Sequence, residues 1–258
     1  TNRLPSIDRM LICDIDNTLI GDKTGLEELL HKVNLANGQV GLGIATGRRL
    51  DSAIKVINEW GIPMPDMLIT AVGTEIHYGY GQNMIEDTGW QSQIDYRWEP
   101  AKLMKAAATI PGLRLQTKID QRTYKISYNI DPDKIPGEKE INRYFRKLDL
   151  HAKLVFSHGA YLDILPVRAS KGLAVRYLSM RWGIPAERFL VAGDSGNDEE
   201  MLSGNNLGVV VGNYSTELER LRGKPRIFFA NKHYARGVLE GIEHYDFLGK
   251  LRLPTETN

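Results

Sequence analysis

Two pairs of carboxylates stand out in the sequence because each pair follows an apolar run. Asp14 and Asp16 come at the end of the first run, and Asp194 and Asp198 follow another run much later in the chain. Such runs are typical of strands buried on both faces of a parallel sheet. Ligands bind at the carboxyl edge of these sheets, so we expect both pairs at one crevice.

Two further residues occupy equivalent positions. Thr46 follows a third apolar run, and Lys171 begins a predicted helix. Taken singly, each residue has another explanation: an Asp-x-Asp-x-Thr segment also occurs at turns, Thr46 suits a helix N-cap, and Lys171 suits a solvated surface. The order of all four clusters along the chain favours one shared site.

These residue types fit the hydrolysis of a phosphate ester. A carboxylate nucleophile such as Asp14 divides the reaction into two displacements through an aspartyl-phosphate. Asp16 can protonate the leaving oxygen and then deprotonate the attacking water. Carboxylates crowded beside a phosphate require a cation, and Mg²⁺ is the expected one. The Thr46 hydroxyl, with the backbone N–H groups after it, would hold phosphate oxygens, and Lys171 would stabilise the transferring group.

The elements that must position these residues alternate between strand and helix. We expect strands at residues 10–15, 40–45, 67–71, 189–192 and 207–211, and helices at residues 26–33, 50–60, 171–182, 197–202 and 238–245. This alternation predicts an α/β fold with a doubly wound parallel, Rossmann-like core sheet.

The order of predicted helices and strands changes in the middle of the chain. Predicted helices and strands repeat there as helix-strand-strand, with strands at residues 113–118, 125–130, 153–157 and 161–165 and helices at residues 100–110 and 136–148. Several links are too short for a parallel crossover, so these strands should pair antiparallel. We therefore expect a catalytic core of residues 1–81 and 161–258, with an α/β cap inserted at residues 82–160.

At all four clusters the sequence resembles the haloacid-dehalogenase superfamily of phosphohydrolases. More narrowly, it resembles sucrose-phosphatase, a family that includes the phosphatase-like domain attached to sucrose-phosphate synthases. The segments that carry the narrower resemblance are residues 14–18, 45–48, 71–76, 125–128 and 193–198. The resemblance extends from about Met10 to Leu248, and it implies a cap that closes on the core and selects the leaving group.

The resemblance also implies roles for individual residues. Metal ligands would be Asp14, Asp194 and the backbone carbonyl of Asp16, with Asp198 beside them or one shell further out. Substrate contacts from the core would be Gly47, Arg48, Thr74, Glu75 and Asn197, and those from the cap Lys125, Ser127, Ser157, His158 and Asp163. The cap residues keep alternatives: Lys125 and Ser127 also suit the solvated side of a strand, and His158-Gly159 suits a tight turn.

The bulk composition is that of an ordinary globular protein. The chain has 258 residues and a formal net charge of +1, which gives no reason to expect a nucleic-acid or membrane partner. Cys13 is the single cysteine, so we expect no internal disulfide, a buried thiol and a cytoplasmic protein.

These observations lead to one main functional hypothesis and several alternatives. We expect a Mg²⁺-dependent sugar-phosphate phosphatase, with sucrose 6-phosphate as the first candidate substrate. Another sugar phosphate, or transfer of the phosphoryl group to a sugar, would use the same core. A further alternative is a phosphatase-like regulatory or binding module fused to or associated with a sucrose-phosphate synthase glycosyltransferase domain. The start at Thr1, followed by polar residues, suits a linker after such a domain.

Overall fold

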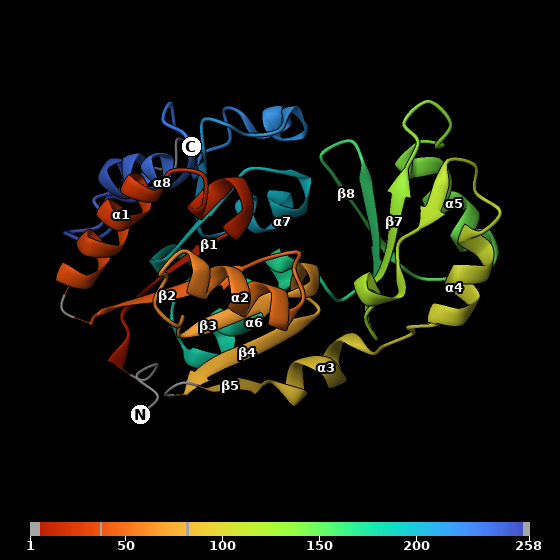
Figure 1. Cartoon of the computed structure of the whole chain (residues 1–258), viewed down its shortest axis with the longest axis horizontal. Coiled ribbons are helices and arrows are strands. Elements are labelled where there is room, and N and C mark those ends of the chain that lie inside the picture. The colour runs from red at the N-terminus through yellow and green to blue at the C-terminus, as the bar shows by residue number, and fades with distance from the viewer. Residues whose placement is uncertain (1–5, 37, 81–82, 255–258) are drawn as a thin grey trace.

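The computed structural model describes residues 6–36, 38–80 and 83–254, which form two β-sheets with helices around them (Figure 1). The larger sheet has eight strands in the order β12-β11-β10-β1-β2-β3-β4-β5. Its strands are β1 (Arg9–Cys13), β2 (Val40–Ala45), β3 (Met67–Thr70), β4 (Glu75–Tyr80), β5 (Asn83–Glu86), β10 (Phe189–Gly193), β11 (Leu207–Val210) and β12 (Ile227–Phe229). The smaller sheet has the order β6-β7-β9-β8 and consists of β6 (Leu113–Leu115), β7 (Ile126–Ile130), β8 (Lys153–Ser157) and β9 (Tyr161–Leu165).

The larger sheet is doubly wound, as predicted. Six of its strands run parallel, and β4 and β5 extend one edge by antiparallel pairing, β4 with β3 and β5 with β4. Along β1, Leu11 and Cys13 pack with α1 (Lys23–Leu35), α2 (Leu50–Glu59) and α8 (Tyr234–His244). Met10 and Ile12 pack on the other face with α3 (Thr88–Ile94), α6 (Lys171–Trp182) and α7 (Glu199–Leu202). Helices on both faces explain why residues 10–13 of this strand are all apolar and buried.

Most predicted elements are present, with shifted ends. Helix α6 has the predicted bounds, whereas α1 begins three residues before the predicted start because the Asp22 side chain accepts a hydrogen bond from Gly25 N. Helix α7 is shorter than predicted, since residues 196–198 form a separate turn. The sequence pattern missed the two edge strands β5 and β12, which are short and partly exposed, and β4, which lies next to β5.

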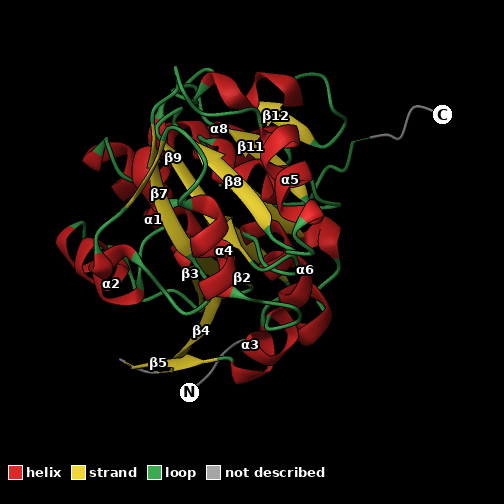
Figure 2. Cartoon of the chain, turned by 90° about the vertical axis from the view of Figure 1, so that its right-hand side faces the viewer, coloured by secondary structure: helices red, strands yellow, loops and turns green. Residues whose placement is uncertain are grey.

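The smaller sheet has its own hydrophobic core, as expected of a separate cap. It is antiparallel throughout, and α4 (Pro100–Ala107) and α5 (Glu138–Lys147) pack against it (Figure 2). Leu103 of α4 and Phe145 of α5 meet Tyr128 and Leu162 of the sheet in this core. The inserted antiparallel unit predicted from the sequence is therefore confirmed.

The predicted ends of the cap, residues 82 and 160, disagree with the strand pairing. Strand β5, expected in the cap, pairs with β4 of the larger sheet, and β9, expected in the core, pairs with β7 and β8. Residues 83–86 carry no strand pattern in the sequence, and for β9 periodicity identifies a strand but not the sheet that it joins. We propose that the cap begins between α3 and α4 and ends after β9. Residue 82, like the expected linker at Thr1, lies outside the described residues.

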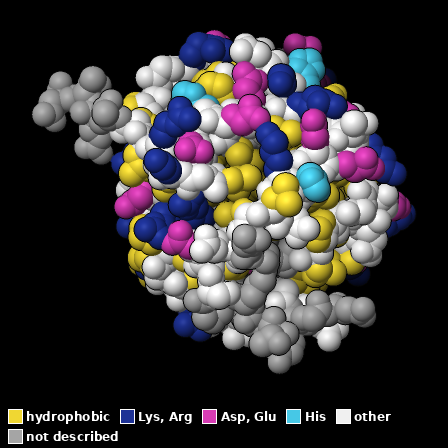
Figure 3. All heavy atoms as spheres, turned by 90° about the vertical axis from the view of Figure 1, so that its left-hand side faces the viewer, with side chains coloured by type: hydrophobic (Ala, Val, Ile, Leu, Met, Phe, Trp, Pro, Cys, Tyr) yellow, Lys and Arg dark blue, Asp and Glu magenta, His cyan; other side chains and the backbone are white. Residues whose placement is uncertain are grey.

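The rest of the surface is mixed. On the face remote from the cap, basic and acidic side chains are interspersed with apolar ones (Figure 3). Among the described residues, no helix is both long enough and apolar enough to cross a membrane. Cys13 is fully buried, as predicted, and burial raises the pKa of its thiol.

Candidate active site

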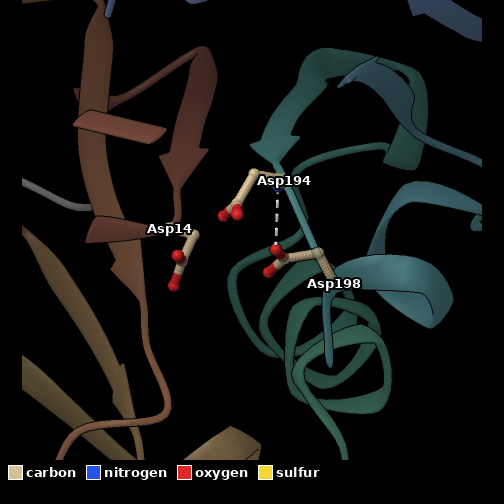
Figure 4. Close-up of side chains that lie close together, drawn as sticks. All are labelled: Asp14, Asp194 and Asp198. Atoms are coloured by element: carbon tan, nitrogen blue, oxygen red, sulfur yellow. Dashed lines mark hydrogen bonds between the residues drawn. The ribbon is translucent and has the colours of Figure 1, made fainter. Parts of the chain in front are cut away.

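Three of the predicted carboxylates meet at the carboxyl edge of the larger sheet. Asp14 follows β1, and Asp194 follows β10, the parallel neighbour of β1. Asp198 comes from the turn that follows β10 and precedes α7, and the three side chains face one another (Figure 4). One carboxylate oxygen of each lies within 4.8 Å of the others. Strands β2 and β3 lie on one side of β1, and β10, β11 and β12 lie on the other. The cluster therefore occupies the point where the strand order reverses, which is where open parallel sheets bind ligands.

Lys171 is the cation of this cluster and not a solvated surface lysine. Its side chain is fully buried, and its Nζ lies 2.7 Å from Asp14 Oδ1, 2.7 Å from Asp198 Oδ1 and 2.8 Å from Asn197 Oδ1. Burial lowers the pKa of Lys171, but Asp14 and Asp198 outweigh that effect and raise it. Lys171 therefore remains charged and joins the first acidic segment to the second.

One ammonium group does not balance three buried carboxylates. Burial raises the pKa of Asp14 to about 7, against the opposing effect of Lys171, with Asp198 raising it further. Burial, followed by the charges of Asp198 and Asp14, raises the pKa of Asp194 to about 8. Both carboxyls resist ionisation because they are buried, lie close to other carboxylates and have only Lys171 to offset them. The cluster thus has the electrostatic character of a cation-binding site.

The hydrogen bonds distinguish which carboxylates have oxygen atoms left for a cation. Asp198 accepts from Lys171 through Oδ1, and from the backbone N–H groups of Asp194 and Ser195 through Oδ2. Within the described part of the chain, Asp14 and Asp194 each use one oxygen, for Lys171 and for Thr18 respectively. Asp14 and Asp194 are therefore the better candidates for direct ligation, and Asp198 holds Lys171 and the loop in place.

Asp16 lies in the same cavity but has a partner of its own. Arg48 donates from Nε to Asp16 Oδ2 at 2.8 Å and from Nη2 to Asp16 Oδ1 at 2.7 Å. The same guanidinium contacts Ser52 Oγ at 3.0 Å. This two-point geometry is the strong form of an arginine–carboxylate pair. It holds Asp16 beside Asp14 and occupies both oxygens of its carboxylate.

Thr46 and Gly47 form the turn after β2. Thr46 is fully buried, and its Oγ1 accepts a hydrogen bond from Arg48 N at 3.1 Å. Helix α2 begins at Leu50, as predicted, and its N-cap is Arg49, so the alternative role of Thr46 as a helix N-cap is wrong. Gly47 lies on the cavity wall, where Asn197 also lies. In this structure Thr46 shapes the turn, and Gly47 faces the cavity.

A cavity of about 430 Å³ lies over the cluster and has walls from both sheets. Its core residues are Asp14, Asp16, Gly47, Arg48, Arg49, Ser52, Ser195 and Asn197, and its cap residues are Gln116, Ile119, Asp120, Lys125, Ser157, His158, Tyr161 and Asp163. The wall carries two arginines and a lysine, which can pair with an anionic ligand, together with four aspartates. Asp14 and Asp16 lie on the core wall, and the cap wall carries neutral and charged polar groups, which suits a phosphate ester of a polar alcohol.

Four of the five predicted cap residues line this cavity. They are Lys125, Ser157, His158 and Asp163. Ser127 is buried and donates to Asp163 Oδ1 at 2.5 Å, so it orients Asp163 without facing the cavity itself. Lys125 Nζ lies 3.7 Å from the same oxygen. His158 also has a positive φ of 54°, so the predicted tight turn and the place in the cavity wall are both present.

Thr74 and Glu75 are not in the wall of this cavity, so their role as substrate contacts stays a prediction. Thr74 donates to the carbonyl of Ala71, and Glu75 accepts from Thr70 and from Arg122 of the cap. Thr74 thereby closes the turn at residues 71–73, where Gly73 has a φ of 95°. A Cβ on Gly73 would lie 2.1 Å from the backbone of Ser170, so this segment supports the start of α6.

The sequence missed several residues of the cavity and its support. These are Arg49, Ser52, Gln116, Ile119, Asp120, Tyr161 and Ser195 in the wall, and Thr18 beside Asp194. Arg49, Thr18 and Ser195 lie next to or within motifs that the sequence identified. The segment 116–120 follows a strand of the cap and carries no pattern that distinguishes it from an ordinary loop.

Comparison with known proteins agrees with this geometry. Residues 7–246 match the family model of sucrose-6F-phosphate phosphohydrolase. The chain belongs to this family. It is 31% identical over 251 residues to a probable sucrose-phosphatase 2 of Arabidopsis thaliana, covering 92% of this chain but 59% of that protein. It thus spans less than two thirds of the length of this plant family member.

Two other similar proteins match nearly end to end. A mannosylfructose-phosphate phosphatase of Agrobacterium fabrum is 29% identical, with 92% of this chain and 96% of that protein covered. The solved structure of the sucrose-phosphatase from Synechocystis sp. PCC6803, in complex with sucrose and phosphate, has a TM-score of 0.85 and 32% identity. It covers 93% of this chain and 98% of its own. The haloacid-dehalogenase fold with a cap, predicted from the sequence, is therefore confirmed.

Proposed function

We propose that this protein is a Mg²⁺-dependent phosphatase that hydrolyses a sugar phosphate, with sucrose 6-phosphate as the preferred substrate. The observation that carries the proposal is the position of Lys171, which lies 2.7 Å from both Asp14 and Asp198 beneath a cavity with cap residues on its other wall. This arrangement supplies a nucleophile and charge stabilisation at one end and a polar site for a sugar at the other.

Asp14 is the nucleophile in the proposed reaction. One of its carboxylate oxygens attacks phosphorus, the bond from phosphorus to the sugar oxygen breaks, and an aspartyl-phosphate forms. Water then attacks phosphorus, the bond to Asp14 breaks, and phosphate leaves. Lys171, held at Asp14 Oδ1, stabilises the anionic nucleophile and the charge on the phosphoryl oxygens.

Asp16 transfers the proton in both steps. It donates a proton to the leaving sugar oxygen and later accepts one from the attacking water. Both of its carboxylate oxygens are paired with Arg48 in this structure, so this pair must open before Asp16 can carry a proton. A phosphate that attracts the guanidinium away from Asp16 would open it, which gives Arg48 a role in substrate binding.

The donor set of the acidic cluster fits Mg²⁺. Asp14, Asp194 and the carbonyl of Asp16 would hold the ion, with Asp198 behind them, and all of these donors are hard oxygen atoms. The bound ion would supply positive charge beside the phosphoryl oxygens. The raised pKa values of Asp14 and Asp194, about 7 and about 8, support the assignment because they reflect burial and mutual repulsion of carboxylates that Lys171 alone does not offset.

The identity of the substrate has one specific alternative. The similarity to sucrose-phosphatases supports sucrose 6-phosphate, and the nearly full-length match to a mannosylfructose-phosphate phosphatase supports that disaccharide phosphate as the second candidate. A regulatory module fused to a synthase is less well supported. Such a module needs no nucleophile, and here Asp14, Lys171 and Asp198 form one connected cluster.

The test is phosphate release from a panel of sugar phosphates, with Mg²⁺ and with a chelator. We expect the highest kcat/KM for sucrose 6-phosphate, no turnover with the chelator, and none for Asp14→Ala. The exposed cap residue Asp133, changed to Ala, is the matched control and should keep full activity. Equal rates across the panel would refute the proposed substrate, and turnover by Asp14→Ala would refute the nucleophile.

A further inference from the structure

Glu217 of the core contacts two separate segments of the chain through its carboxylate. It lies in the turn formed by residues 216–221. Its Oε2 accepts a hydrogen bond from Gly196 N of the core at 2.8 Å, and its Oε1 accepts one from Gly159 N of the cap, also at 2.8 Å. Gly196 lies in the loop after β10, and Gly159 lies in the turn between β8 and β9. One side chain therefore joins the loop of the acidic cluster to the cap.

The two joined segments are in close contact. Strand β8 is the part of the cap sheet that faces α7 of the core (Figure 1). A Cβ on Gly196 would lie 2.3 Å from the carbonyl oxygen of Phe156, so only glycine fits beneath this strand. Lys153 at the other end of β8 contacts Glu200 of α7 at 2.7 Å. Glu217 thus acts at a surface where cap and core already meet.

Both segments carry cavity residues. Ser157 and His158 come from the cap turn, and Ser195 and Asn197 come from the core loop. Asn197 Oδ1 in turn accepts a hydrogen bond from Lys171. The position of the cap turn relative to the loop therefore sets the distance between the sugar end and the phosphoryl end of the cavity. Glu217 is outside the cavity wall and acts on both ends through backbone N–H groups.

We propose that Glu217 is a positioning residue that holds the cap turn 157–159 against the core loop 195–198 when the cap is closed. Movement of the cap away from the core breaks the bond to Gly159 and leaves the bond to Gly196 intact. A carboxylate that accepts two amide N–H groups makes charge-assisted bonds, so its loss should favour the open form. A smaller closed population lowers the apparent affinity for any substrate that the cap must contact. The consequence for sugar phosphates rests on the function proposed above.

The first test compares a substrate that needs the cap with one that does not. In Glu217→Gln, the amide keeps one acceptor oxygen and turns its NH₂ toward one of the two N–H donors. Glu219→Gln is the matched control, because Glu219 lies in the same turn and contacts Tyr214 and Arg222 instead of the cap. We expect KM for sucrose 6-phosphate to rise on the order of tenfold in Glu217→Gln, with kcat/KM for p-nitrophenyl phosphate within about twofold of wild type.

The control should match wild type on both substrates. A Glu217→Gln variant that also matches wild type, or that loses activity equally on both substrates, would overturn the proposal. Equal loss would indicate general damage to the core, and urea unfolding of the variant would identify it.

The second test measures the position of the cap without any substrate. Spin labels at Lys55→Cys on α2 and Lys147→Cys on α5 report the distance between core and cap, and Cys13 is buried and escapes labelling. We expect Glu217→Gln to add a population at longer distance that Glu219→Gln lacks. Identical distance distributions in Glu217→Gln and Glu219→Gln would overturn the proposed role of Glu217. If the wild type hydrolyses no sugar phosphate, the proposed function fails, whereas this measurement still decides the role of Glu217.

Discussion

Replacement of Asp194 by asparagine should stabilise the metal-free protein while it removes activity. Asp194 is buried at 2% exposure, and its pKa of about 8 lies far above the ordinary value of 3.8. At about pH 7.5 Asp194 is ionised in the unfolded chain, whereas the folded protein favours the protonated form. Folding is therefore coupled to the uptake of a proton, which is unfavourable at this pH. At about 1.4 kcal/mol for each pH unit above 3.8, this requirement costs about 5 kcal/mol.

The asparagine removes this cost and introduces a smaller one. Its Oδ1 can still accept the hydrogen bond from Thr18, which is 3.1 Å long in the wild type. The new amide N–H₂ is buried, and we take about 1–3 kcal/mol as the cost of its desolvation. We therefore expect a net gain of about 2–4 kcal/mol in the free energy of unfolding. The sign follows from the raised pKa: the charged form opposes folding, and its penalty grows as the pH rises from 3.8 toward 8.

The assay is urea unfolding of both proteins with a chelator, at about pH 7.5 and at about pH 5. At about pH 5 the wild-type penalty falls to about 2 kcal/mol, so the gain should nearly vanish. Excess Mg²⁺ should then stabilise the wild type and have little effect on Asp194→Asn, which should also lose phosphatase activity. A variant less stable than wild type at about pH 7.5 with chelator, or a gain that does not depend on pH, would refute the reasoning.

Two further stability changes are expected, with different signs and locations. Lys171→Met should destabilise the metal-free protein by about 3–5 kcal/mol in urea unfolding, because it leaves Asp14 and Asp198 buried without their cation; no loss would contradict that role. Burial acts to raise the pKa of Glu75, but its contacts with His77, Thr70 and Arg122 prevail and lower the pKa to about 2. The ionised carboxylate therefore stabilises the fold above about pH 4.5, and this contribution is lost as the pH falls toward 2. Between about pH 5 and pH 3 the wild type should lose about 2 kcal/mol more than Glu75→Gln, and parallel losses would show that the ion pair contributes nothing.

The acidic end of the cavity was largely predictable from local sequence. A buried parallel strand must be apolar, and a polar residue that ends it must lie at the carboxyl edge of the sheet. Asp14 and Asp194 follow such strands, and Lys171 begins α6 as the sequence indicated. These positions depend on secondary structure and chain direction alone. Their convergence at one cluster confirms that part of the prediction.

The roles of the remaining residues depended on partners distant in the chain. Glu75 belongs to a recognisable motif, yet its carboxylate contacts Arg122 of the cap, 47 positions later, and does not face the cavity. Ser127 lies on the predicted strand but bonds to Asp163 of another strand. Strand β9 joins the cap sheet because it pairs with β7 and β8, although its own residues would suit either sheet.

Sequence alone therefore determined which residues could perform the chemistry and at which edge of the sheet they lie. Only the tertiary structure decided which side chains face the cavity, which ones support it, and how the cap contacts the core. The physical reason is that local patterns specify backbone conformation and burial, whereas the direction of a polar side chain depends on the donor or acceptor that folding brings to it. Glu217 shows this most clearly, since its two partners, Gly159 and Gly196, come together only in the folded chain.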